Sequence, residues 1–174
     1  MKNGWKQALQ AAGLIVFTIA VRFLRVFPNN DPIMGLLARG RRKSLVWMFL
    51  FPVLAIVAFD AITGSIGLWT TVTALTYGVV SLLLVFSWSM VAKVTLLGKV
   101  WRTIAAVLVF DFISGPILGT IAWGMSFTSS FVGQIPFTLW HLGSATAWLG
   151  AYELMALAWR LSVHREVAVE TKVA

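Results

Sequence analysis

The chain has 174 residues, of which 59% are hydrophobic and 11% are charged, and its formal net charge is +8. A soluble domain carries about 25% charged residues, so this composition excludes an ordinary soluble protein and favours one that is solvated by lipid. The basic residues stand in short clusters between apolar runs, which is typical of membrane topology rather than of nucleic-acid binding, and the absence of cysteine excludes disulfides and thiolate sites.

Long apolar segments follow one another along the chain, and each is close to the roughly 20 residues that a membrane-spanning helix needs. They predict an all-α integral membrane bundle. The segments are residues 8–27, 45–61, 68–92, 100–122 and 135–160. The first follows a basic start, as in a signal peptide, but no small-residue cleavage site follows a short apolar core, so we expect a retained helix.

The segment 29–38 leaves two topologies open, because it is apolar after Pro32 but only about half as long as a span. As a short second helix inside the protein, it gives a bundle of six helices with both termini in the cytoplasm. The basic clusters then lie inside, as the positive-inside rule requires, and only Arg22 and Arg25 lie outside. As a cytoplasmic loop, it gives five spans with the amino terminus outside. Charge alone does not choose between them.

The rest of the organisation is simple. We find no internal repeat and no linker, so residues 1–174 are expected to form a single domain, with a charged cytoplasmic tail from about residue 162. A polar, uncharged loop is expected from Gly124 to Gln134. In both topologies this loop and the turn near Gly64 face outward, and the carboxyl terminus faces inward.

Carboxylates in or near the spans are the first candidates for function, because an ionisable group at membrane depth costs about 2.5 to 3.5 kcal/mol on insertion scales. Asp111 lies near the middle of its helix, either as a ligand contact or ion-pair partner in a cavity, or as a structural hydrogen-bonding group. Asp60 lies at the outer end of its helix, where it is solvated or pairs with Arg22 or Arg25. The four residues are Asp31, Asp60, Asp111 and Glu153.

Two helical stripes of polar and aromatic residues accompany these carboxylates. On the last helix they are His141, Ala145, Trp148 and Tyr152, and on the third long helix they are Thr70, Thr73, Tyr77 and Ser81. Spacings of three and four residues place each set on one face. The first stripe either stacks on a flat ligand or packs against another helix, and the hydroxyls of the second either line a pocket or hold helices together.

Other features limit the chemistry. Pro116 in the fourth long helix predicts a kink beside Asp111, which either opens a cavity or is a simple bend. There is no nucleophile elbow, phosphate loop or paired-histidine motif, and two histidines make no convincing metal site. We therefore expect no enzyme, no metal and no cofactor.

Three stretches resemble the substrate-binding membrane subunits, called S components, of energy-coupling factor (ECF) vitamin transporters, and most closely a small, poorly characterised branch of them. The resemblance rests on motif order and spacing over roughly residues 20–160, since each motif alone has low specificity. The stretches are Arg22-Phe23-Leu24-Arg25-Val26-Phe27-Pro28-Asn29-Asn30-Asp31-Pro32, then Phe51-Pro52 through Phe59-Asp60 with Gly64, and Gly133-Gln134-Ile135-Pro136-Phe137 with Gly143.

The resemblance implies six helices, a short second helix, and a ligand pocket that opens outward and is lined by the last three helices. Its contacts would be Asn29, Asn30 and Asp60 near the loops and Trp69, Asp111 and His141 on the walls, to which the stripes add Tyr77 and Trp148. Small residues on the first helix would contact a partner subunit, and Ala8 and Ala12 are a rough match. Asp111, His141 and Ser144 depart from the branch, which leaves the ligand's identity open.

The expected function is therefore a substrate-binding subunit in the cell membrane that captures a small vitamin-like molecule from outside. Uptake would be driven by an ECF membrane coupling subunit and a separate ATPase module. The alternative is a structural or accessory subunit of a larger membrane complex, in which Asp111 and Glu153 would pair with charges on neighbouring chains.

Overall fold

A computed structural model describes residues 2–24, 30–39, 45–89 and 95–173. Six helical segments form the bundle, and the described part of the chain contains no strand. Five of the segments are α1 (Lys2–Leu24), α2 (Pro32–Arg39), α3 (Leu45–Thr63), α4 (Leu68–Ser89) and α7 (Phe127–Val173). The sixth lies between α4 and α7 and consists of three elements without a break: α5 (Leu96–Phe112), η1 (Ile113–Ile117) and α6 (Leu118–Trp123). The predicted all-α bundle with a short second helix is confirmed.

Three helices within the described ranges are long and apolar enough to cross a membrane: Leu45–Thr63, Leu68–Ser87 and Leu96–Trp123. The apolar part of α1, Ala11–Leu24, is shorter. Large apolar side chains are exposed along these helices, as in Leu54, Leu83 and Leu108. Hydrocarbon tails solvate such surfaces without cost, so the structure is consistent with a membrane protein.

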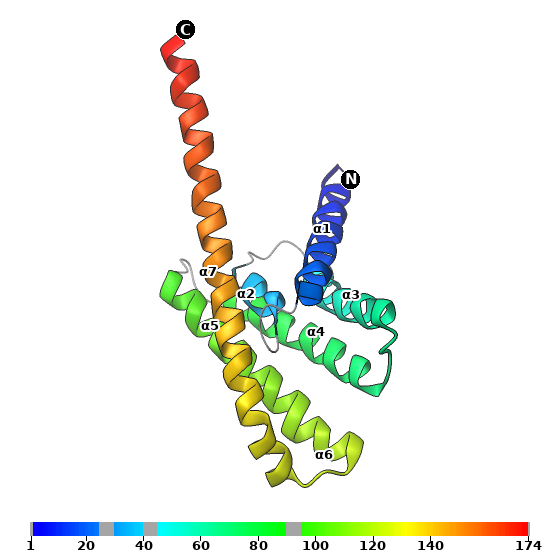
Figure 1. The fold of residues 1–174 in the computed structure, drawn as a ribbon. Helices are drawn as coiled ribbons and strands as arrows, with labels where there is room; N and C mark the ends of the chain where they lie inside the picture. Colours follow the sequence, from blue (N-terminus) through cyan, green and yellow to red (C-terminus); the bar gives the residue numbers. More distant parts are fainter. Residues whose placement is uncertain (1, 25–29, 40–44, 90–94, 174) are drawn as a thin grey trace.

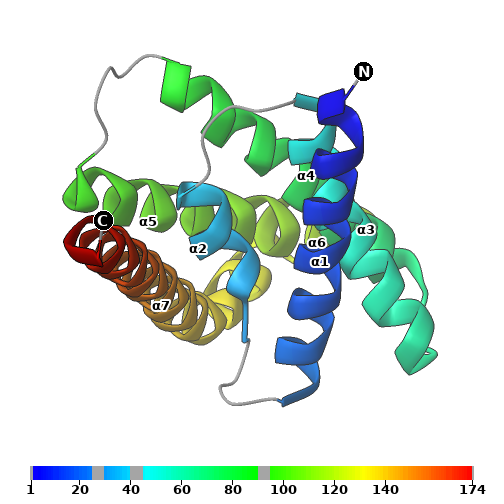
Figure 2. The same cartoon turned by 90° about the horizontal axis from the view of Figure 1, so that it is seen from above.

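The helices form two groups that meet at α2. On one side α3 packs against α4 and α1, and on the other α7 packs against α2 and α5. Figure 2 shows α2 in the middle, with α1 and α3 on one side and α5 and α7 on the other. With eight residues α2 is only about 12 Å long. Its side chains Ile33, Met34 and Ala38 are fully buried, so it is an interior element.

Gly35 allows α2 to lie close to α7. A Cβ atom on Gly35 would lie 2.6 Å from the carbonyl oxygen of Ala145 and 2.7 Å from the backbone nitrogen of Leu149. Both distances are far shorter than van der Waals contact. The two backbones therefore touch at this point, and no other residue type fits there without displacement.

The predicted kink at Pro116 is a π-helical segment, η1, that joins α5 to α6. Proline has no N–H group, so the helical hydrogen-bond ladder is interrupted and re-forms with a longer repeat. Ser130 of α7 donates its hydroxyl to the Gly115 carbonyl at 3.0 Å, which satisfies one acceptor beside the irregularity. Gly124, with φ of +64°, then ends α6.

The last helix begins earlier than predicted and extends beyond the predicted span. The loop expected as far as Gln134 ends earlier, because Ser126 accepts the backbone N–H of Ser129 at 3.1 Å and caps α7 at Phe127. The helix also continues through the expected tail to Val173. With 47 residues it is about 70 Å long, more than twice the hydrocarbon thickness. Figure 1 shows its carboxyl-terminal part projecting beyond the other helices.

Candidate functional site

Asp31 is the centre of a buried polar cluster at the start of α2. It precedes Pro32, and its Oδ1 accepts the backbone N–H of Ile33 at 2.8 Å, so it caps the helix. Its Oδ2 accepts the Tyr77 hydroxyl at 2.8 Å and lies 2.7 Å from Nε2 of His141. Its backbone N–H donates to the Ser144 hydroxyl. Asp31 therefore connects α2 to α4 and α7.

His141 lies between two carboxylates. Its Nε2 contacts Asp31, and its Nδ1 lies 2.9 Å from Oδ1 of Asp111 on α5. The three side chains are at most 4% exposed. A neutral imidazole has one N–H, so two donated hydrogen bonds need a doubly protonated ring or a proton on one carboxylate. The cluster thus holds a proton in the middle of the bundle.

Asn30 forms a second polar link beside this cluster. Its amide nitrogen donates to the Val21 carbonyl at 2.9 Å, and its Oδ1 accepts the indole N–H of Trp148 at 2.8 Å. One turn further along α7, the Tyr152 hydroxyl donates to the Pro32 carbonyl at 3.3 Å. Phe17 of α1 packs against both aromatic rings. The predicted stripe on the last helix is therefore an interior face that holds α1 and α2.

The structure brings five of the predicted site residues together. These are Asn30, Tyr77, Asp111, His141 and Trp148. Tyr77 and His141 contact Asp31, Asp111 contacts His141, and Trp148 contacts Asn30, the residue before Asp31. Asn29 lies outside the described residues. The side chain of Ala8 is also outside them, and that of Ala12 is exposed on α1.

Asp60 and Trp69 lie elsewhere, at the turn between α3 and α4. Asp60 Oδ2 accepts the Thr70 hydroxyl at 2.6 Å, and Trp69 packs against Trp123 with ring centroids 5.4 Å apart. The guanidinium of Arg22 lies 5.0 Å from the ring centroid of Phe59, next to Asp60 in sequence. The turn is thus fixed by its own side chains.

We expect Asp60→Asn to lower stability only slightly, by about 0.5–1.5 kcal/mol, because one hydrogen bond at a half-exposed turn is weakened. Detergent-solubilised protein unfolded by SDS would measure the change. Ligand affinity should stay the same. A loss of affinity with unchanged stability would instead make Asp60 a ligand contact, as the family resemblance implies.

The sequence contains a signal for the role of Asp31 at the start of α2. An Asp followed by Pro before a short apolar segment is the pattern of a capping residue at a helix start. No local sequence pattern identifies Asp31 as the partner of His141, because the two residues are 110 positions apart. Ser144, one turn after His141, was noted only as a departure from the family and proves to bind the Asp31 backbone.

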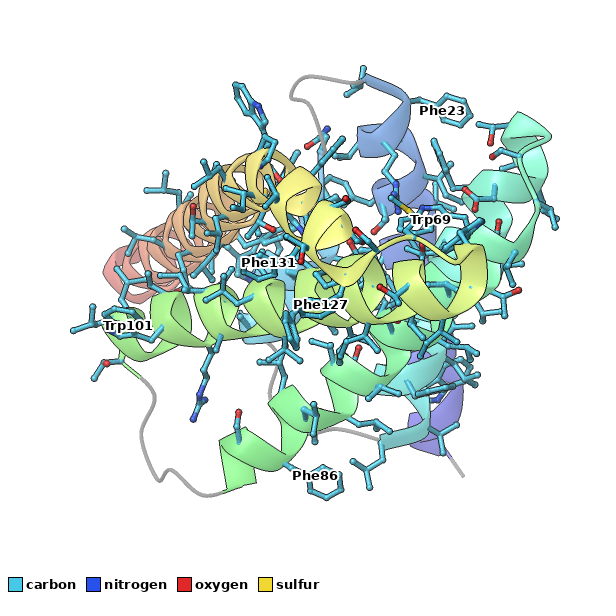
Figure 3. All side chains as sticks on the ribbon, turned by 90° about the horizontal axis from the view of Figure 1, so that it is seen from below. Phe23, Trp69, Phe86, Trp101, Phe127 and Phe131 are labelled. Atoms are coloured by element: carbon cyan, nitrogen blue, oxygen red, sulfur yellow. The ribbon has the colours of Figure 1, made fainter. Side chains whose placement is uncertain are left out.

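A groove of about 390 Å³ lies beside the cluster, between α5–η1 and α7. Its walls are mainly apolar and aromatic: Leu108, Val109, Phe112, Pro116, Phe131 and Ile135, with Gln134, Thr138 and Asp111 as the polar members. Figure 3 shows Phe127 and Phe131 next to each other on α7. Their rings are stacked with centroids 6.1 Å apart, and both contact Phe112.

Asp111 joins the groove to the polar cluster. Its Oδ1 contacts His141, but its Oδ2 is buried and has no hydrogen-bond partner among the described residues. An unsatisfied carboxylate oxygen in a low-dielectric region is unfavourable, so a hydrogen-bond donor from outside the chain would stabilise it. No group of His, Asp or Glu side chains in the described ranges is arranged to hold a metal ion.

Comparison with known proteins finds no matching family model, no matching curated protein and no matching solved structure.

Proposed function

We propose that this chain is the substrate-binding membrane subunit of an ECF-type transporter. It captures a small, vitamin-like molecule, and a separate coupling subunit and ATPase module drive uptake. The observation that carries the proposal is Oδ2 of Asp111, which has no hydrogen-bond partner in the described part of the chain and lies beside a groove of about 390 Å³. The chain itself performs no chemistry in this proposal.

The groove has the properties of a small-molecule site. Such sites have volumes of about 300–1,000 Å³, mostly apolar walls and a few polar groups that fix the ligand's orientation. Here the polar groups are Asp111, Gln134 and Thr138. A carboxylate retained in a membrane-spanning helix is expensive, and its default role is functional.

The buried cluster supports the site by fixing Asp111. His141 binds Asp111 Oδ1, and Asp31 with Tyr77 fixes His141 from the other side. The side chain of Asp111 is thereby held in one orientation. A polar group that is held in place before binding loses less entropy when the ligand arrives.

The alternative role, an accessory subunit of a larger complex, is not favoured by the charges. It requires Asp111 and Glu153 to pair with neighbouring chains. Glu153 instead accepts a hydrogen bond from Lys99 Nζ at 2.8 Å, which joins α7 to α5. Glu153 thus has a partner within the chain, and Oδ1 of Asp111 is paired with His141.

In the proposed topology all six helices belong to the membrane domain, with α2 inside it and both termini in the cytoplasm. The basic residues at 39–43 and 93–102 then lie on the cytoplasmic side. The exposed side of α1 near Ala12 is where the coupling subunit would dock.

Native mass spectrometry of the purified protein tests ligand capture. We expect a small molecule to copurify with the wild type, and Asp111→Asn to lower its affinity at least about tenfold, because a charged acceptor becomes a neutral amide. Asp60→Asn is the matched control, since it changes a carboxylate away from the groove. Equal occupancy in wild type and Asp111→Asn would contradict the site, and failure to bind a coexpressed coupling subunit and ATPase would contradict the transporter assignment.

A further inference from the structure

The groove opens sideways from the bundle. Its wall residues Leu108 and Ile135 are each 47% exposed, and Phe112 and Phe131 are each 44% exposed. Leu108 and Phe112 lie in the middle of the 28-residue apolar helix Leu96–Trp123, at the depth of the hydrocarbon core. An exposed surface at that depth faces acyl chains. The mouth of the groove therefore faces the bilayer and neither aqueous side.

Asp111 is the charged member among the described residues that line this groove. A carboxylate oxygen only accepts hydrogen bonds when ionised, so a molecule that satisfies Oδ2 must bring an N–H or O–H donor. Water is scarce at this depth, and the donor must therefore belong to the molecule that enters from the lipid.

The local charges favour a cationic donor. Two carboxylates, Asp31 and Asp111, share one imidazole, which contributes at most one positive charge. Arg22 acts electrostatically on Asp31 and Tyr77, and it does not line the groove. The Asp111 side of the cluster is thus the negative side, where a monocation is stabilised.

The aromatic residues at the groove favour the same chemistry. Phe112 and Phe131 line it, and Phe127 stacks on Phe131. The faces of such rings attract a cation within about 6 Å, and the attraction is stronger where water is excluded. Their remaining surface suits an apolar or aromatic body.

We infer, on the basis of the proposed function, that the ligand is a lipophilic amine that enters the groove sideways from the bilayer and donates its ammonium N–H to Asp111 Oδ2. The apolar body lies along the phenylalanine and leucine walls. Gln134 and Thr138 also line the groove, and their side-chain oxygens would accept the remaining ammonium protons.

Three probes with one scaffold test the chemistry: phenylbutylamine, phenylbutanol and butylbenzene, each titrated into protein in lipid nanodiscs and followed by tryptophan fluorescence. We expect the amine to bind at least about tenfold more tightly than the alcohol, and the hydrocarbon to bind most weakly. In Asp111→Asn the preference for the amine should disappear. An alcohol that binds as tightly as the amine, or an amine preference that survives in Asp111→Asn, would overturn the inference.

A steric variant tests the location without touching the polar cluster. Thr138→Trp places a large ring in the groove and should weaken amine binding at least about tenfold, because the ring occupies the space of the ligand's apolar body. Leu139→Trp is the matched control, because Leu139 follows Thr138 in sequence but is 65% exposed and does not line the groove. Equal weakening by both variants, or by neither, would contradict a site in the groove.

The two proposals fail in different ways. If a water-soluble molecule copurifies with the protein and Thr138→Trp leaves its affinity unchanged, ligand capture stands and lateral access from lipid is wrong. If the amine binds as described but the chain does not associate with a coupling subunit and ATPase, the groove stands and the transporter assignment is wrong.

Discussion

His141→Ala should destabilise the protein by about 3–5 kcal/mol, which is among the largest effects of any single substitution in this chain. The imidazole lies 2.7 Å from Asp31 Oδ2 and 2.9 Å from Asp111 Oδ1, and all three side chains are buried. Its removal leaves two carboxylates near each other without the cation or shared proton that now separates them. SDS-induced unfolding, followed by loss of helical circular dichroism, would measure the change.

A second substitution shows whether charge is the cause. Asp31 keeps its hydrogen bonds to Tyr77 and Ile33 when His141 is lost, whereas Asp111 loses the one that links it to α7. Adding Asp111→Asn to His141→Ala should therefore restore about 1 kcal/mol or more, because the stranded charge is removed. If the loss of unfolding free energy in the double variant equals the sum of the losses in the two single variants, simple loss of packing explains the result and the ionic account is wrong.

Gly35→Ala should also be strongly destabilising, with a cost of about 2–3 kcal/mol for a single methyl group. The added Cβ would lie 2.6 Å from the carbonyl oxygen of Ala145 and 2.7 Å from the nitrogen of Leu149. These are backbone atoms, so no side-chain rotation relieves the contact and α2 must move away from α7. That movement separates Asp31 from His141, and we expect ligand affinity to fall together with stability.

Gly150→Ala is the matched control, because it lies on α7 close to the same contact. A Cβ atom there meets nothing within 4 Å. It should leave stability unchanged or raise it by up to about 1 kcal/mol, since alanine favours a helix. Unfolding of both variants in one detergent compares them directly. Equal stability of Gly35→Ala and Gly150→Ala would show that α2 does not touch α7 as described.

The positions of the helices were largely predictable, because hydrocarbon demands long apolar segments with basic residues between them. Composition and segment length predicted the bundle, whereas the run after Pro32 allowed either a half-length helix or a loop, and the family resemblance favoured the helix that the structure contains. The start of α7 was predicted about eight residues too late. Ser126 and Ser129 form a cap that is visible in the sequence, but the polar residues around them were interpreted as a loop.

The candidate site was predictable only in part. Asp111 and His141 stood out because ionisable groups are rare in such helices, and periodicity placed His141 and Trp148 on one interior face. Asp60 and Trp69 were grouped with them through the family resemblance, although the structure places them at the turn between α3 and α4. Loops that adjoin a pocket in one protein need not do so in another.

The amino-acid sequence alone determined that this chain is a helical protein suited to lipid, and it determined which few residues carry charge or hydrogen-bonding groups within the helices. Both follow from local composition, since transfer into hydrocarbon depends on each segment's own side chains. Only the tertiary structure decided that Asp31 and Asp111 share His141, and that Asp111 Oδ2, beside a groove, has no partner among the residues described. These pairings depend on how α2, α5 and α7 pack, and no local pattern specifies contacts between residues 30 and 110 positions apart.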